Sequence, residues 1–80
     1  MQKNINPQAV DIGAFLKATR EDLDLSQIKV MELTGINNKT LSGYENNVAQ
    51  PDIQTLACLA RLYGFSIDAL FGLNQDDNKK

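Results

Sequence analysis

The 80-residue sequence has no histidine and a single cysteine, Cys58. One cysteine cannot form an internal disulfide, and without histidine the usual mixed ligand sets of zinc sites are missing. We interpret Cys58 as a small apolar residue in or near the core. No apolar run approaches the roughly 20 residues of a membrane span, and the N-terminus lacks the apolar core of a signal peptide. These absences favour a cytoplasmic protein with no metal, no cofactor and no membrane partner.

Positive charge is also scarce. Eight Lys and Arg residues face ten Asp and Glu residues, which gives a net charge of −2 and a pI near 4.8. Proteins that bind nucleic acids usually carry a basic surface, because release of counterions from phosphates supplies much of their affinity. The sequence also offers no nucleophile with a plausible base, no glycine-rich phosphate loop and little chain for a pocket, which argues against an enzyme.

The apolar spacing predicts helices throughout and no strand. Residues three and four positions apart form one face of a first helix: Ile12, Phe15, Leu16, Thr19 and Leu23. Asn6 and Pro7 suit the start of this helix. A fourth helix, after a cap at Asp52, carries the most apolar face: Ile53, Leu56, Ala57, Leu59, Ala60 and Tyr63. It ends at Gly64, and a short fifth helix follows a cap at Ser66.

Residues 26–47 are the stretch around which the chain is organised, and they predict two short helices joined by a tight turn. Ser26 is a candidate N-cap, Gly35 can end the first helix in the left-handed conformation, and Asn37 can cap the second. The apolar residues expected to face one another are Val30, Met31, Leu41 and Tyr44, with Ile36 in the turn. Helices this short need the flanking helices to complete their core.

Several short motifs then occur in a characteristic order: Leu25-Ser26-Gln27, Thr34-Gly35-Ile36, Thr40-Leu41-Ser42, Tyr44-Glu45-Asn46, Gln50-Pro51 and residues 62–70. With these motifs, the chain from Ile12 to Leu73 resembles the phage repressor and Cro-type (XRE-like) helix-turn-helix domains. The resemblance implies an all-α, compact five-helix bundle of the lambda-repressor-like type, in which helices 2 and 3 form the helix-turn-helix. We expect one domain over residues 1–80, with a folded core of about 7–73 and flexible tails at 1–6 and 74–80.

The resemblance also assigns roles in binding double-stranded DNA. The positions that face base edges in the major groove are Asn38, Lys39, Ser42 and Gly43. The positions placed for phosphates are Gln27, Thr40 and Asn46, and Gln27 would use both its side chain and its backbone amide at a helix N-terminus. The alternative is a solvated polar helix face. Arg20 and Glu45 match an ion pair that ties the first helix to the end of the recognition helix, the alternative being a plain surface pair.

Some residues depart from the family pattern. Lys29 stands where an acidic or amide side chain would complete a capping box with Ser26. Gly43 removes a base-reading side chain and costs about 1 kcal/mol of helix propensity relative to Ala, although it can permit close backbone approach to DNA. Asn47 replaces the usual glycine, and residues 48–50 carry no positive charge. DNA binding by a monomer should therefore be weak, with a shallow salt dependence.

The leading interpretation is a sequence-specific transcriptional regulator, more in keeping with a repressor than an activator. It would bind a two-fold symmetric operator as a homodimer through residues 38–46, without a small-molecule effector domain. The candidates for the dimer contact are Ile67, Leu70, Phe71 and Leu73, with internal packing as the alternative for Ile67 and Leu70. The alternative function is a protein-interaction module of the same fold, such as a small antitoxin or a partner of a larger regulator.

Overall fold

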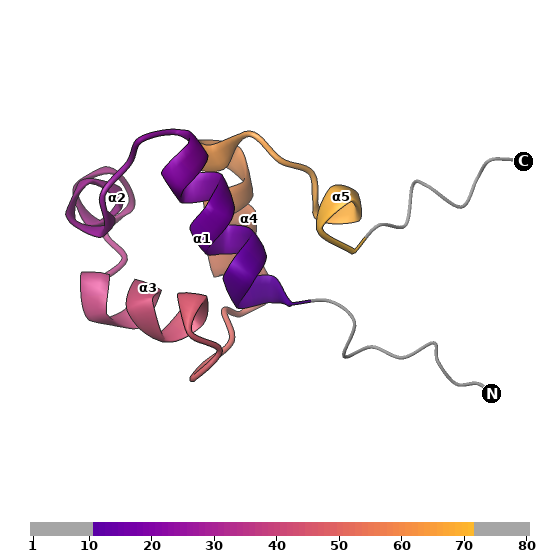
Figure 1. Cartoon of the computed structure of the whole chain (residues 1–80), viewed down its shortest axis with the longest axis horizontal. Helices are drawn as coiled ribbons and strands as arrows, with labels where there is room; N and C mark the ends of the chain where they lie inside the picture. The colour runs from indigo at the N-terminus through magenta and orange to yellow at the C-terminus, as the bar shows by residue number, and fades with distance from the viewer. Residues whose placement is uncertain (1–10, 72–80) are drawn as a thin grey trace, which may run out of the picture.

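The computed structural model describes residues 11–71, which form five α-helices (Figure 1). The helices are α1 (Ile12–Asp22), α2 (Gln27–Thr34), α3 (Asn38–Glu45), α4 (Ile53–Tyr63) and α5 (Ile67–Phe71). Within that range there is no strand, so the prediction of an all-α bundle is confirmed. The expected start of the first helix at Asn6 and Pro7 is wrong, because Asp11 has extended backbone angles and caps α1, which begins at Ile12. The outer limits of the predicted core, 7–73, lie outside the described residues.

A side-chain cap begins every helix. Oxygen atoms of the cap residues accept from backbone amides two or three residues further on, at 2.8–2.9 Å: Asp11, Ser26, Asn37, Asp52 and Ser66. Four of these caps were predicted. Asp11 was not, and its carboxylate accepts from the amide of Ala14. Each cap satisfies an amide that has no partner inside the helix, and the sequence therefore determines where each helix begins.

Left-handed residues let the chain turn between helices. Gly35 and Gly64 end α2 and α4 with φ of 82° and 83°, as predicted. Two non-glycine residues, Asp24 and Asn47, also have positive φ, of 59° and 60°. Asp and Asn tolerate this conformation better than other L-residues. The four residues separate the helices into short segments that fold back on one another.

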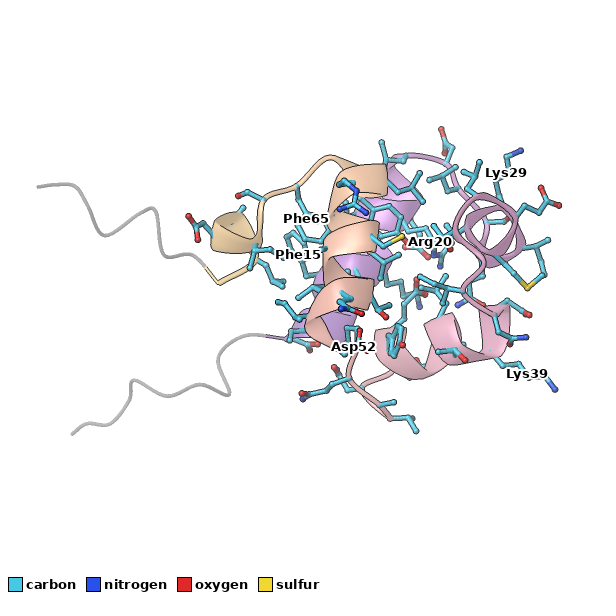
Figure 2. All side chains as sticks on the ribbon, turned by 180° about the vertical axis from the view of Figure 1, so that it is seen from behind. Phe15, Arg20, Lys29, Lys39, Asp52 and Phe65 are labelled. Atoms are coloured by element: carbon cyan, nitrogen blue, oxygen red, sulfur yellow. The ribbon has the colours of Figure 1, made fainter. Side chains whose placement is uncertain are left out.

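The core lies between α1, α4 and the α2–α3 unit. Its fully buried side chains come one from each of four helices: Leu16, Val30, Leu41 and Leu59. The fifth helix contributes Leu70, which is buried in the same cluster. Phe15 packs edge-on against Phe65, with ring centroids 4.9 Å apart, in the part of the core towards α5 (Figure 2). Every helix therefore depends on the others for its apolar contacts.

Two predicted core positions are wrong. Leu23 is 46% exposed, because α1 ends at Asp22 and Leu23 no longer follows the helical face that buries Leu16. Ile53 is 67% exposed at the first position of α4. Both residues lie at a helix terminus, where the periodic apolar face is not continued. None of the described helices is long and apolar enough to cross a membrane.

The first turn of α1 lies directly against the end of α3. A Cβ added to Gly13 would sit 2.6 Å from the carbonyl oxygen of Glu45 and 2.7 Å from that of Tyr44. Beside this contact, the Asn47 carboxamide accepts from the amide of Gly13 at 3.1 Å and donates to Asp11 at 2.8 Å. The hydrogen bond from Ala14, and then that from Asn47, lower the pKa of Asp11. This close approach requires glycine at position 13.

We predict opposite effects on stability for alanine at the two helical glycines. Gly13→Ala should destabilise the protein by about 1–3 kcal/mol, because the new methyl group meets backbone oxygen atoms that cannot move aside. Gly43→Ala should stabilise it by about 0.5–1 kcal/mol, because the nearest atom is Ala49 Cβ at 4.0 Å and alanine favours the helix. Urea unfolding of both variants tests this. Equal effects would show that α1 and α3 are not in close contact.

Tyr63 on α4 is buried, and among residues 11–71 its hydroxyl has no hydrogen-bond partner. Burial, with a contribution from the charge of Glu45, raises the pKa of Tyr63 to about 12. A tyrosine in an unfolded chain titrates near pH 10. As the pH rises, the unfolded state therefore loses the Tyr63 proton first. The contribution of the neutral Tyr63 side chain to the free energy of unfolding is complete below about pH 10 and disappears as the pH rises to about 12.

Tyr63→Phe should therefore reduce the loss of stability between pH 10 and pH 12 by up to about 2 kcal/mol. At neutral pH the same change should be close to neutral, since it removes a buried hydroxyl without a partner. Chemical unfolding measured from pH 7 to 12 tests both parts, with Tyr44→Phe as the matched control for loss of a phenol. If Tyr63→Phe lost as much stability between pH 10 and pH 12 as the unmodified protein, the raised pKa of Tyr63 would not be the cause of that loss.

Candidate nucleic-acid interface

The two helices of the central unit occupy one end of the molecule, and α5 lies at the other (Figure 1). Between Thr34 and Asn38 the chain reverses through Gly35, and Val30 of α2 packs in the same buried cluster as Leu41 of α3. The hydroxyl of Thr34 accepts from the amide of Ile36 at 3.0 Å, which closes the turn from inside. This arrangement fixes the angle at which α3 leaves α2 and leaves the outer face of α3 uncovered.

A buried ion pair joins α1 to the last residue of α3. Arg20 Nε donates to Glu45 Oε2 at 2.7 Å and Arg20 NH2 donates to Oε1 at 3.0 Å. The two side chains are 10% and 2% exposed, which does not fit the alternative of a plain surface pair. The hydrogen bond to Glu45 raises the pKa of Arg20. Arg20 NH1 also donates to the carbonyl of Leu25 at 2.7 Å, so the same guanidinium holds the loop before α2.

Gln27, the first residue of α2, is half-buried, and its Nε2 donates to Glu45 Oε1 at 3.0 Å. The amide of Lys29 is already occupied by the cap oxygen of Ser26, at 2.9 Å. The amides of Gln27 and Ile28 belong to the first turn, where no helical carbonyl is available to them. The helix start therefore presents two backbone donors beside a side chain that α3 holds in place.

The outer face of α3 carries short polar side chains. Lys39, Thr40 and Asn46 are exposed, whereas Asn38, Ser42 and Gly43 are half-buried. Asn46 Nδ2 donates to the hydroxyl of Ser42 at 3.3 Å, which links two neighbouring polar groups. The carbonyl of Gly43 accepts from the amides of Val48 and Ala49 at 2.8 and 3.2 Å. All six predicted base-reading and phosphate positions of residues 38–46 are therefore at least partly exposed, and their roles in DNA binding stay a prediction.

Lys39 is the cation that this surface presents. Lys29 lies 3.7 Å from Glu32 in an exposed pair, and Glu45 is paired with Arg20. Within residues 11–71, Lys39 has no acidic partner at ion-pair distance. Figure 2 shows Lys29 and Lys39 pointing away from the protein at the end formed by α2 and α3. The surface is therefore polar with one unpaired positive charge, rather than strongly basic.

The dimer-contact candidates at the C-terminal end are partly used inside the protein. Leu70 is buried in the core, and Ile67 packs against that core. Leu73 and the side chain of Phe71 lie outside the part of the chain that the structure describes. Internal packing, the alternative for Ile67 and Leu70, is what the structure shows for both side chains.

Several positioning contacts were not foreseen from the sequence. A glycine inside a helix is a signal of close approach, and Gly13 could have been read that way. Asn47 was noted only as a replacement for the family's usual glycine, and its contact with Asp11 spans 36 residues. No sequence signal indicates the bond from Gln27 to Glu45, because their separation of 18 residues depends on the tertiary arrangement of α2 and α3.

The short α2, the three-residue turn and the uncovered α3 together define a helix-turn-helix unit. A family model described as helix-turn-helix matches residues 16–70, which is more than half of the chain. This chain therefore belongs to the XRE-like helix-turn-helix family. The predicted fold and the assignment of α2 and α3 to the motif agree with that family.

Curated relatives carry names of the same kind. The chain is 34% identical over 70 residues to the HTH-type transcriptional regulator ImmR of Bacillus subtilis, covering 88% of this chain and 55% of ImmR. It is 34% identical over 65 residues to the uncharacterized HTH-type transcriptional regulator YobD of the same species, covering 81% and 58%. It is 32% identical over 76 residues to the HTH-type transcriptional regulator PuuR of Escherichia coli, covering 81% and 41%.

The chain thus spans about half the length of the curated relatives it matches. No solved structure gives a significant match.

Removing one partner of the buried ion pair should be far more damaging than removing one partner of the exposed pair. Arg20→Ala should reduce the free energy of unfolding by about 3–5 kcal/mol, because it leaves the buried Glu45 carboxylate without a cation. Glu32→Gln, which breaks the exposed pair with Lys29, should change it by at most about 1 kcal/mol. Chemical unfolding at neutral pH compares the two. Similar small losses would mean that the Arg20 pair does not hold α1 to α3.

Proposed function

We propose that this domain is a sequence-specific DNA-binding transcriptional regulator, a binding protein rather than an enzyme, acting in the cytoplasm. The observation that carries the proposal is the surface of α3, where Lys39 is exposed among hydroxyl and carboxamide groups and has no acidic partner in the described part of the chain. An α-helix that projects in this way fits the major groove of B-DNA. The relatives named as HTH-type transcriptional regulators support the same function.

In this proposal α3, with Asn46 at its end, lies in the major groove. Lys39 would donate to the O6 and N7 acceptors of guanine, and Asn38 could pair with adenine. Ser42 reads bases ambiguously, while Gly43 has no side chain to read with and leaves room for the backbone to approach. One half-site would therefore be specified mainly by Lys39, with few further base contacts.

Phosphate contacts in this proposal are mostly uncharged. The amides of Gln27 and Ile28 begin α2, where the helix dipole favours an anion. Thr40 on α3 and Asn46 at its end are exposed and can donate to phosphates on either side of the groove. Because few lysines or arginines take part, few counterions are released, and affinity should depend only weakly on salt. One domain alone should bind weakly.

A homodimer would bind DNA more tightly than one domain, since two α3 helices spaced by about one DNA turn, roughly 34 Å, read a two-fold symmetric operator. We propose such a dimer and, by analogy with the phage repressors, repression rather than activation. Since Leu70 and Ile67 already pack internally, the contact between protomers would rest mainly on Phe71 and Leu73.

One observation favours a second candidate function, a protein-interaction module of the same fold. Ile28 and Leu33 on α2 are 47% and 52% exposed, close to a surface with one unpaired cation. An antitoxin or a regulator partner could cover such apolar side chains, whereas phosphates offer them no favourable contact. A test of the DNA proposal therefore needs to distinguish the loss of the Lys39 charge from the loss of any other positive charge on the protein.

Lys39→Glu should abolish binding to duplex DNA at low salt, because it replaces the base-reading cation with an anion that phosphates repel. Arg61→Glu makes the same charge change on the exposed side of α4 and should weaken binding only slightly. Fluorescence anisotropy with randomised duplexes measures both, and circular dichroism confirms folding. Equal losses in the two variants would mean that binding is general electrostatics, and no binding by the unmodified protein would favour the protein-interaction module.

A further inference from the structure

The Glu45 carboxylate, at the end of α3, is the common acceptor for side chains from two other segments. Its Oε2 accepts from Arg20 Nε, and its Oε1 accepts from both Arg20 NH2 and Gln27 Nε2, each at 3.0 Å. The carboxylate is almost fully buried, at 2% exposure. Because an ionised carboxylate can only accept hydrogen bonds, Gln27 must turn its NH2 group towards Glu45. The orientation of the Gln27 carboxamide is therefore fixed by chemistry.

A carboxamide has two N–H donors, and the bond to Glu45 uses one of them. Among residues 11–71 the second N–H of Gln27 has no acceptor, and Gln27 is the first residue of α2, whose first amides also lack a helical carbonyl. The loop before α2 is held by the same cluster, since Arg20 NH1 donates to the carbonyl of Leu25 at 2.7 Å. The buried pair of Arg20 and Glu45 therefore holds both the Gln27 side chain and the loop before α2, at a helix start that favours an anion.

We propose that Glu45 is a positioning residue for DNA binding, which holds the Gln27 carboxamide so that its second N–H donates to a DNA phosphate at the start of α2. The proposal rests on the DNA-binding function above. It makes α3 responsible for two tasks, since its outer face reads bases while its last residue fixes the phosphate contact of α2. The spacing between the base contact and the phosphate contact is then set inside one rigid cluster.

This arrangement also suits a protein with little positive charge. A freely rotating glutamine loses side-chain entropy when it binds a phosphate, whereas a glutamine already held by Glu45 has lost much of it on folding. An uncharged donor gains from such preorganisation. If Glu45 served only to stabilise the fold, the contribution of Gln27 to DNA binding would not depend on it.

A double-mutant cycle separates these two roles. Gln27→Met removes the carboxamide and keeps the length of the side chain, and Arg20→Met with Glu45→Leu replaces the buried ion pair by apolar side chains, which often preserves stability. In the unmodified background, Gln27→Met should weaken DNA binding about tenfold, the loss of a hydrogen bond to a charged group. In the Arg20→Met, Glu45→Leu background it should weaken binding less than twofold. The same factor in both backgrounds would overturn the proposal.

The double-mutant cycle requires that the Arg20→Met, Glu45→Leu variant folds. NMR of the unmodified protein provides a second test, which needs no variant. In the free protein, one side-chain NH2 proton of Gln27 should be shifted downfield and protected from exchange, and the second should become protected only with DNA. Two unprotected protons in the free protein, or an unchanged second proton in the complex, would overturn the positioning role. If the unmodified protein binds no DNA, the proposed function itself fails, whereas the free-protein signal still reports on the tether.

Discussion

The structure depends on one buried interaction, the bidentate pair of Arg20 and Glu45. These two side chains join α1 to the end of α3, and they also hold Leu25 and Gln27 at the start of α2. Two charges buried in so small a protein are stabilising only when their hydrogen bonds are satisfied, and here both oxygen atoms of Glu45 have donors. The pair therefore fixes the relative positions of three helices, which is the geometry that a helix-turn-helix needs.

The contact between α1 and α3 is completed at its other end by Gly13 and Asn47. Gly13 lets the backbones approach to a distance that no side chain would allow, and Asn47 hydrogen bonds across the gap. Arg20 and Gly13 lie seven residues apart on α1, about two helical turns. The end of α3 is thus held against α1 at two points, near Gly13 and at Arg20.

Much of this fold was predictable because it follows from local chemistry. Ser26, Asn37, Asp52 and Ser66 cap helices as their side chains suggest, and Gly35 and Gly64 end them. Periodicity identified Leu16 and Leu59 but failed at Leu23 and Ile53, where the helices end. The DNA-binding surface stays a prediction from the family resemblance, and the bonds of Gln27 and Asn47 were not predicted. Those bonds join residues far apart in the sequence, and they follow from the packing of α3 rather than from any local pattern.

The central claim is that α3 reads DNA sequence, although the protein has a net charge of −2. In the proposed function Lys39, which has no acidic partner within residues 11–71, reads bases from a polar surface, and backbone amides bind phosphates. The most direct test is selection from randomised duplex DNA at low salt, followed by sequencing of the retained duplexes. We expect enrichment of a two-fold symmetric motif with guanine in each half-site, the two halves about one helical turn apart. Retention without any enriched motif, or no retention at all, would contradict the claim.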